Sequence, residues 1–420
     1  MQIESALRKT HPLAGFVYTN FRMYEKRFRE GFICECTIRP RKRAKPLCGI
    51  CGKKCPGYDT LKERRFDFVP FWGMSVYLLY AMRRVTCLEH GVVVERVPWA
   101  SGKSPMTYAM MLFVASWAKL LSWKETSRRF GISWDSVFRA VEHVVTWGLA
   151  NRDLDGIRSI GVDELSYKKG QKYITMVYQI DLGCRRLLHI AEHRTKDSFR
   201  SFFDMIGNER SQKIEFVASD MWKPFRSVIK ERCGDATHVL DRFHIMQHMS
   251  KAIDETRRQE MKSLRASGRE AVLTGARWLL LKRKPNLKKS ERVKLRDLVS
   301  INLRSVRAYL LKEQFQHFWT YRSELWARRF LDGWIRTVNR SRIEPMKKFA
   351  KTLRNHEDLL FNWFKARNQF AAGATEGFNN KARITTRNAY GFRTYRCTEI
   401  ALYHSLGKLP DPNWVTHRFY

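Results

Sequence analysis

Two short apolar runs that each end in an acid, IRSIGVDE at residues 157–164 and IEFVASD at residues 214–220, decide the fold of this chain. Both have the β-branched composition of strands, and turn signals bound them. Further elements are predicted between and after these runs. In chain order they are strands at 173–181 and 186–191 joined by a hairpin at 182–184, a helix over 196–205, a helix that starts near Pro224, and a strand at 237–241.

Three antiparallel strands, a helix, a strand, a helix and a strand form the element order of an RNase H-like domain. In that arrangement the first and fourth strands are neighbours at the sheet centre, so Asp163 and Asp220 are expected to meet. Two close carboxylates repel each other unless a cation binds between them. Two Mg²⁺ (or Mn²⁺) ions would meet this need and suit in-line phosphoryl transfer. Alternation along the first strand turns Glu164 away from Asp163, which makes Glu164 a weaker candidate.

A third acid is expected from a later helix, and the segment ATEGFNNKAR at 374–383 supplies Glu376. Thr375 is expected to cap this helix. Polar side chains then recur at i+3, i+4 and i+7, so they share a face with Glu376, which an apolar core face would not show. We predict Asp163, Asp220 and Glu376 as the catalytic metal ligands. The neighbouring residues expected to contact DNA are Asn379, Asn380, Lys381 and Arg383.

The charge of the chain indicates a polyanionic partner. Among 420 residues, Lys and Arg number 79 and Asp and Glu 41, which gives a net charge of +38. Such a field attracts nucleic acid and stabilises phosphate contacts by counterion release. A ribosome-associated or membrane-surface protein is the alternative. The start of the chain lacks a long apolar segment, and the apolar stretch 106–118 is too short for a membrane helix. We expect a cytoplasmic, nucleoid-associated protein with no membrane partner.

Six of the nine cysteines lie in the segment from Cys34 to Cys87. In a reducing compartment such clusters favour metal binding over disulfides. The runs CGIC at 48–51 and CLEH at 87–90 have the spacing of two zinc knuckles. We predict a structural Zn²⁺ held by Cys48, Cys51, Cys87 and His90. Unmetallated thiols or a redox pair are the alternatives, and Cys34, Cys36 and Cys55 are spare ligands.

Residues 122–141 have the pattern of a helix-turn-helix. A first helix ends near Phe130, Gly131 permits the turn, and Ser133 can cap the second helix. The second helix would read the major groove. An ordinary helical hairpin is the alternative. The residues expected to contact DNA are Arg128, Arg129, Trp134, Ser136 and Arg139.

The fold class is therefore α/β and multi-domain. An all-α insertion interrupts the RNase H-like catalytic domain, and zinc-binding and helix-turn-helix domains precede it. The expected domains are a zinc-binding domain at 1–97, a helix-turn-helix domain at 98–150, the first catalytic part at 151–245, the insertion at 246–365, and the final catalytic helix and tail at 366–420.

Four motifs, GVDE, VASDMWKPF, LDRFH and TEGFNNKARITTRNAYGFR, resemble those of bacterial insertion-sequence transposases of the ISL-three type, within the wider DDE transposases. The resemblance covers nearly the whole chain. It implies that Asp163, Asp220 and Glu376 are the three metal ligands, and that the enzyme, usually a homodimer, cuts at terminal inverted repeats and joins the ends to target double-stranded DNA. Asp241 and His244 match a supporting Asp-x-x-His signature. His244 then organises the active site, contacts the flanking DNA or packs a helix.

Two rival functions fit parts of this pattern. One is a zinc-dependent DNA-binding regulator whose RNase H-like domain is inactive. The other is a stand-alone structure-specific nuclease, which would nick DNA without joining a 3′ end to a target. The combined helix-turn-helix and zinc motifs favour recognition of defined end sequences, and so a transposase.

Overall fold

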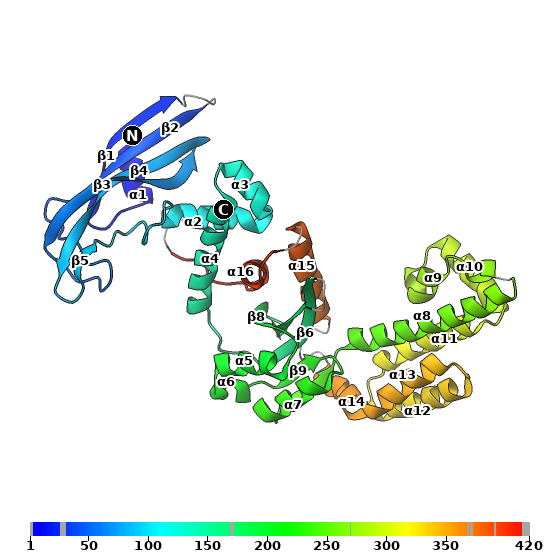
Figure 1. Ribbon diagram of the computed structural model, residues 1–420. Helices are drawn as coiled ribbons and strands as arrows, with labels where there is room; N and C mark the ends of the chain where they lie inside the picture. Colours follow the sequence, from blue (N-terminus) through cyan, green and yellow to red (C-terminus); the bar gives the residue numbers. More distant parts are fainter. Residues whose placement is uncertain are drawn as a thin grey trace. The chain divides into compact units, whose positions relative to one another are not determined.

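The computed structural model describes residues 3–25, 31–168, 172–268, 270–367, 369, 373–389 and 392–413 (Figure 1). Its contacts divide the chain into two compact units. Unit 1 contains residues 1–153 and 384–420, and unit 2 contains residues 154–383. Both units mix helices with a β-sheet, which confirms the α/β, multi-domain class. Each unit is described by itself.

Unit 1 begins with a long twisted sheet. Its strand order is β1-β2-β4-β3, and β5 extends it beside β4. Alternating residues of β4, among them Val76, Leu78 and Tyr80, are buried on one face, where Trp99 packs edge-to-face against Tyr80. The elements are α1 (Ile3–Thr10), β1 (Phe16–Glu25), β2 (Phe32–Pro40), β3 (Gly57–Phe71), β4 (Met74–Cys87) and β5 (Gly91–Val94).

Three helices follow, namely α2 (Tyr108–Leu120), α3 (Trp123–Phe130) and α4 (Trp134–Asn151). Gly131 adopts the left-handed conformation (φ 63°) between α3 and α4, and Ser133 caps α4 by accepting from the Ser136 amide. These features confirm the predicted turn and cap. Val137 and Val141 on α4 are fully buried.

Unit 2 contains a five-stranded sheet of order β10-β9-β6-β7-β8. As predicted, β6 is antiparallel to β7 and lies beside β9, in parallel, with Gly161 opposite Ala218. The Phe-rich helix α5 and the helix α7 share one core with β6, β7 and β9. The elements are β6 (Ser159–Lys168), β7 (Lys172–Ile180), β8 (Arg185–Glu192), α5 (Lys196–Ile206), α6 (Asn208–Gln212), β9 (Phe216–Ser219), α7 (Lys223–Arg232) and β10 (Thr237–Leu240).

A helical region with its own apolar core follows β10, as predicted. Trp319 and Trp334 lie in this core, whereas Trp326 is exposed beneath the guanidinium of Arg329. The α-helices are α8 (Arg242–Ala266), α9 (Arg277–Leu281), α10 (Lys289–Ser300), α11 (Arg304–Phe315), α12 (Glu324–Arg340), α13 (Glu344–Asn355) and α14 (Glu357–Ala366), with short 3-10 turns at Glu270–Leu273, Lys284–Asn286 and Gln316–Thr320. Among the described residues, no helix is long and apolar enough to cross a bilayer.

The last part of the chain is shared by the two units, which differs from the single segment expected at 366–420. Helix α15 (Ala374–Asn388) belongs to unit 2 as far as Arg383. Helix α16 (Tyr395–Leu406) belongs to unit 1, where it packs against α4. The physical reason is burial, because Ile400 and Leu402 are fully covered in unit 1.

Candidate active site

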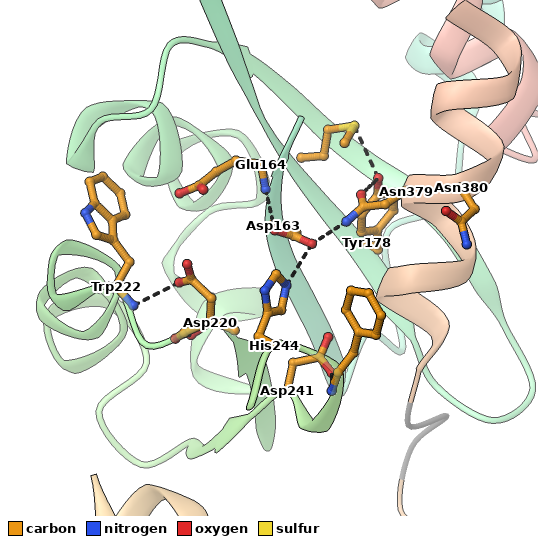
Figure 2. Close-up of polar contacts among 12 residues, drawn as sticks. Asp163, Glu164, Tyr178, Asp220, Trp222, Asp241, His244, Asn379 and Asn380 are labelled. Carbon is orange, nitrogen blue, oxygen red and sulfur yellow. Dashed lines mark hydrogen bonds and ion pairs between the residues drawn. The ribbon is translucent and has the colours of Figure 1, made fainter. Parts of the chain in front are cut away.

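The first two acids lie side by side on the unit 2 sheet. Asp163 is in the middle of β6, which continues to Lys168 instead of ending near Asp163 as predicted, and Asp220 directly follows β9, the parallel neighbour of β6. Because Gly161 pairs with Ala218, Asp163 and Asp220 each lie two residues beyond this pair, at the same level of the sheet. Figure 2 shows both side chains next to His244. The charge of Asp163 helps to raise the pKa of Asp220, although burial is the larger cause.

The Asp163 carboxylate is held by three donors. Its Oδ1 accepts from the amide of Glu164 (2.7 Å), and its Oδ2 accepts from the side-chain amide of Asn379 and from His244 Nε2 (3.1 Å). Asn379 is itself fixed, because the Tyr178 hydroxyl donates to its Oδ1 (3.0 Å). This chain of hydrogen bonds fixes the position of the acid against α15 (Figure 2).

Asn379 therefore does not fit the predicted contact with DNA. Its side chain is buried, and both of its amide atoms are used within the protein. The side of α15 that carries Phe378 and Asn379 packs on the sheet, where Phe378 stacks on Tyr178 with ring centres 4.6 Å apart. We reassign Asn379 as the residue that holds Asp163. The other three residues predicted on this helix, Asn380, Lys381 and Arg383, are exposed.

A glycine allows the helix to approach the strand. A Cβ atom at Gly161 would lie 2.6 Å from the Thr375 Oγ1, so any side chain there would force one of the two residues to shift. Thr375 lies inside the first turn of α15, since the helix starts at Ala374, so the expected cap at Thr375 is wrong by two residues. The same turn carries Glu376. Burial raises the pKa of Asp241, and the charges of Asp163 and Glu376 add to this effect.

His244 is a cationic residue in contact with Asp163. Burial opposes its charge, but the hydrogen bond to Asp163 and the charges of Asp163, Asp241 and Asp220 outweigh burial and raise its pKa to about 9. Asp241 caps α8, because its carboxylate accepts from the Phe243 amide (2.8 Å), and this cap places His244 in the first turn. Of the three roles that the sequence left open, the contact with Asp163 favours organisation of the active site.

A second cation, which the sequence analysis missed, joins the site from the turn before α5. The Nε of Arg194 lies 2.5 Å from Glu164 Oε1, and its Nη2 lies 3.5 Å from Asp220 Oδ2. Glu164 turns away from Asp163, as predicted, yet it remains in the acidic cluster. Burial, and next the charge of Asp220, raise its pKa to about 7. No motif surrounds Arg194, so only its three-dimensional contacts identify it.

The acids form a looser group than a filled metal site. Among the described residues, the only set of three or more His, Cys, Asp or Glu ligand atoms within 4.8 Å of one another is the Cys and His cluster of unit 1. Even so, the acidic cluster fits a hard divalent cation, because carboxylate oxygens such as those of Asp163, Asp220 and Glu376 are the ligands that Mg²⁺ prefers. Within the described part of the chain, no hydrogen bond or ion pair engages the Glu376 carboxylate.

The predicted zinc ligands are brought together in unit 1. Cys51 Sγ lies 3.8 Å from Cys87 Sγ, and His90 Nδ1 lies 3.5 Å from Cys87 Sγ and 3.9 Å from Cys48 Sγ. Hydrogen bonds from the backbone amides of Glu89 and then His90 help to lower the pKa of Cys87 to about 7, although burial acts in the opposite direction. Three thiols and one imidazole at this spacing could bind a tetrahedral zinc. Cys55 is near but outside the set.

The helix-turn-helix residues differ in exposure. Arg128, Arg129 and Arg139 are exposed on α3 and α4. Ser136 is partly used, because its hydroxyl bonds with the Ser133 hydroxyl (2.9 Å). Trp134 is 39% exposed and stacks on Phe138, with a ring separation of 5.9 Å, so one of its faces is covered.

Comparison with known proteins now identifies the class. Residues 160–402 match the DDE_Tnp_ISL3 family, which is described as Transposase. The transposase for insertion sequence element IS1557 of Mycobacterium tuberculosis (strain H37Rv) is 32% identical over 383 residues, 85% of each chain. The transposase for insertion sequence element IS1001 of Bordetella parapertussis is 26% identical over 350 residues, 83% of this chain and 85% of that one.

These matches and the acidic cluster define a DNA transposase, a metal-dependent enzyme that cleaves and transfers DNA. The chain belongs to the ISL-three family of DDE transposases, which confirms the resemblance seen in its motifs.

Proposed function

We propose that this transposase binds the inverted repeats at the ends of its insertion sequence, cleaves the DNA there and joins the 3′ ends to target DNA. Asp163, Asp220 and Glu376 are the proposed catalytic metal ligands. The observation that carries the proposal is the juxtaposition of Asp163 on β6 and Asp220 at the end of the neighbouring strand β9, with α15 tied to Asp163 through Asn379. The strand order of unit 2 supports an RNase H-like catalytic domain.

The three acids would hold two Mg²⁺ or Mn²⁺ ions, which when bound supply a Lewis acid at the scissile phosphate and lower the pKa of a bound water or 3′-hydroxyl. The residues of the chain perform the positioning. His244 and Asn379 fix one oxygen of Asp163, and the amide of Trp222 fixes one oxygen of Asp220 (2.9 Å). A fixed carboxylate loses little freedom when a ligand binds, so this preorganisation favours the reaction.

Other parts of the chain would bind DNA. The net charge of +38 supports an extended contact with phosphates. Lys381 and Arg383 are exposed on the helix that carries Glu376, and we assign them to the phosphates at the cleavage site. The helix-turn-helix, through Arg128, Arg129 and Arg139, would read the repeat sequence, with smaller contributions from Trp134 and Ser136.

The cluster of Cys48, Cys51, Cys87 and His90 would hold one structural Zn²⁺. Its four protein ligands leave no open position, so this zinc stabilises the N-terminal fold rather than taking part in catalysis. We also propose the five domains expected from the sequence, with the last one divided at Arg383, and a homodimer that pairs two element ends.

The test is a reaction of the purified full-length protein with Mg²⁺, DNA that carries the inverted repeats flanking its gene, and a plasmid target. The proposal predicts cut repeat ends and joined products, both abolished by EDTA. Binding to the repeats without any cleavage would favour the inactive regulator instead. Nicks without joined products would favour the stand-alone nuclease.

A further inference from the structure

Besides His244, the acidic cluster contains a second cationic side chain, the guanidinium of Arg194. Arg194 lies in the turn between β8 and α5, directly before Thr195, which caps α5. The preceding residue, His193, adopts a positive φ of 71°, which turns the chain between the strand and the helix. The side chain is 35% exposed, while those of its partners Glu164 and Asp220 are 9% and 17% exposed.

Three contacts position this guanidinium. Its Nε lies 2.5 Å from Glu164 Oε1, its Nη2 lies 3.5 Å from Asp220 Oδ2, and its centre lies 4.5 Å from the ring centre of Trp222. Arg194 thus bridges two acids that come from different strands. The stacking on Trp222 restricts the plane of the guanidinium, and a planar fork of donors needs this restriction to bridge two carboxylates.

The two ionic contacts differ in strength. The contact with Glu164 is short and partly shielded from water, so Glu164 anchors the arginine. The contact with Asp220 is long, at the outer limit for a hydrogen bond. A divalent cation bonds to a carboxylate oxygen at about 2.0–2.1 Å and carries twice the charge. Such an ion can therefore displace Arg194 from Asp220 without breaking the anchor to Glu164.

We propose that Arg194 is the resident counter-cation of the metal site, a positioning residue that holds Asp220 Oδ2 in the metal-free protein and yields this oxygen when a divalent cation binds. After the exchange, Arg194 remains on Glu164 beside the site, where its positive charge favours the phosphate of bound DNA. The inference rests on the proposed function, because it takes Asp220 as a metal ligand. It assigns the neighbouring Glu164 a separate task, which is to anchor Arg194.

This exchange predicts opposite effects for the two members of one ion pair. Arg194→Gln removes a positive charge that competes with the metal, so Mn²⁺ should bind more tightly to the DNA-free protein, on the order of tenfold. Glu164→Gln removes a negative charge from the same cluster, so Mn²⁺ should bind more weakly by a similar factor. If the salt bridge only stabilised the fold, Arg194→Gln and Glu164→Gln would both weaken Mn²⁺ binding.

The experiment is a Mn²⁺ titration of the full-length, DNA-free protein, with free Mn²⁺ measured by electron paramagnetic resonance. The variants are Arg194→Gln, Arg194→Lys, Glu164→Gln and Asp220→Asn. Arg200→Gln is the matched control, because Arg200 forms an equivalent ion pair with Glu231 outside the site. We expect Arg194→Lys to bind Mn²⁺ nearly as the wild type does, and Arg200→Gln to leave the binding unchanged.

Cleavage of repeat-end DNA provides the second readout. At saturating Mn²⁺, Arg194→Gln should cut more slowly than the wild type despite its tighter metal binding, and Arg194→Lys should restore part of the rate. An affinity for Mn²⁺ in Arg194→Gln that is equal to or weaker than that of the wild type would overturn the inference alone. Binding of Mn²⁺ that is unaffected by Asp220→Asn would overturn the proposed metal site as well.

Discussion

Asn379 donates a hydrogen bond to Asp163, although 216 residues separate them in the sequence. Through this bond, the helix that carries Glu376 is tied to the strand that carries Asp163. The Tyr178 hydroxyl holds the other end of the Asn379 amide. The pair therefore explains how the third acid can return to the first two after a long helical insertion.

The first prediction concerns this bond. Asn379→Ala should lower the single-turnover rate of DNA cleavage about 10²-fold, because Asp163 and α15 are then no longer held in position by a hydrogen bond. Loss of a buried hydrogen bond to a charged group should also cost about 1–3 kcal/mol of stability. Asn379→Asp should be worse, since it places a second carboxylate against Asp163. The matched control is the exposed neighbour in Asn380→Ala, and an equal loss of rate in both variants would contradict the assignment.

The second prediction concerns the close approach of α15 to β6. Gly161→Ala should destabilise unit 2 by about 1–3 kcal/mol and reduce cleavage, because the new methyl group overlaps the Thr375 hydroxyl. Thr375→Ala removes this hydroxyl, so the double variant should recover much of the loss. A double-mutant cycle by thermal unfolding measures the coupling. Additive losses of stability would show that the two positions are not sterically coupled.

The third prediction concerns the pH dependence of stability through His404 in α16. Burial, and next the charge of Lys119, lower the pKa of His404 to about 3. Because the folded-state pKa lies below the ordinary value of about 6.5, the contribution of His404 to the free energy of unfolding is complete above pH 6.5 and is lost as the pH falls toward 3. His404→Leu should therefore weaken the fall in melting temperature between pH 7 and pH 4.5. An unchanged pH profile in this variant would refute the prediction.

The fourth prediction concerns zinc. Elemental analysis should find about one zinc per chain in the wild type, and much less in Cys48→Ser and Cys87→Ser. Both variants should lose order in the N-terminal sheet and bind DNA more weakly. Cys55→Ser is the matched control, because Cys55 lies beside the four ligands but outside the set. Normal zinc content in Cys87→Ser, or its loss in Cys55→Ser alone, would require a different ligand set.

Much of the fold could be predicted because it follows from local patterns. Apolar runs that end in Asp163 and Asp220 indicated two neighbouring strands, and Gly131 with Ser133 indicated the turn and cap of a helical pair. Each of these signals lies within a few residues, where backbone sterics and capping decide the structure.

The rest depends on contacts between distant segments. Asn379 looked like a DNA-facing residue, because a polar helix face ordinarily points to solvent, yet its side chain is buried against Tyr178 and Asp163. Arg194 lies in a turn without any motif, and only the fold brings it to Asp220. Helix α16 packs with α4 rather than extending the catalytic unit, which no periodicity in its own sequence could indicate.

The most direct test of the central claim is the single-turnover rate of repeat-end cleavage in Mg²⁺ for Asp163→Asn, Asp220→Asn and Glu376→Gln, each at a protein concentration that saturates the DNA. Asp197→Asn is the control, because Asp197 is an exposed acid on α5 that pairs only with Arg200 among the described residues. We predict a loss of at least about 10³-fold in each of the three variants with DNA binding retained, and an unchanged rate in the control. Cleavage at a rate near that of the wild type in any of the three would contradict the assignment of that acid as a catalytic metal ligand.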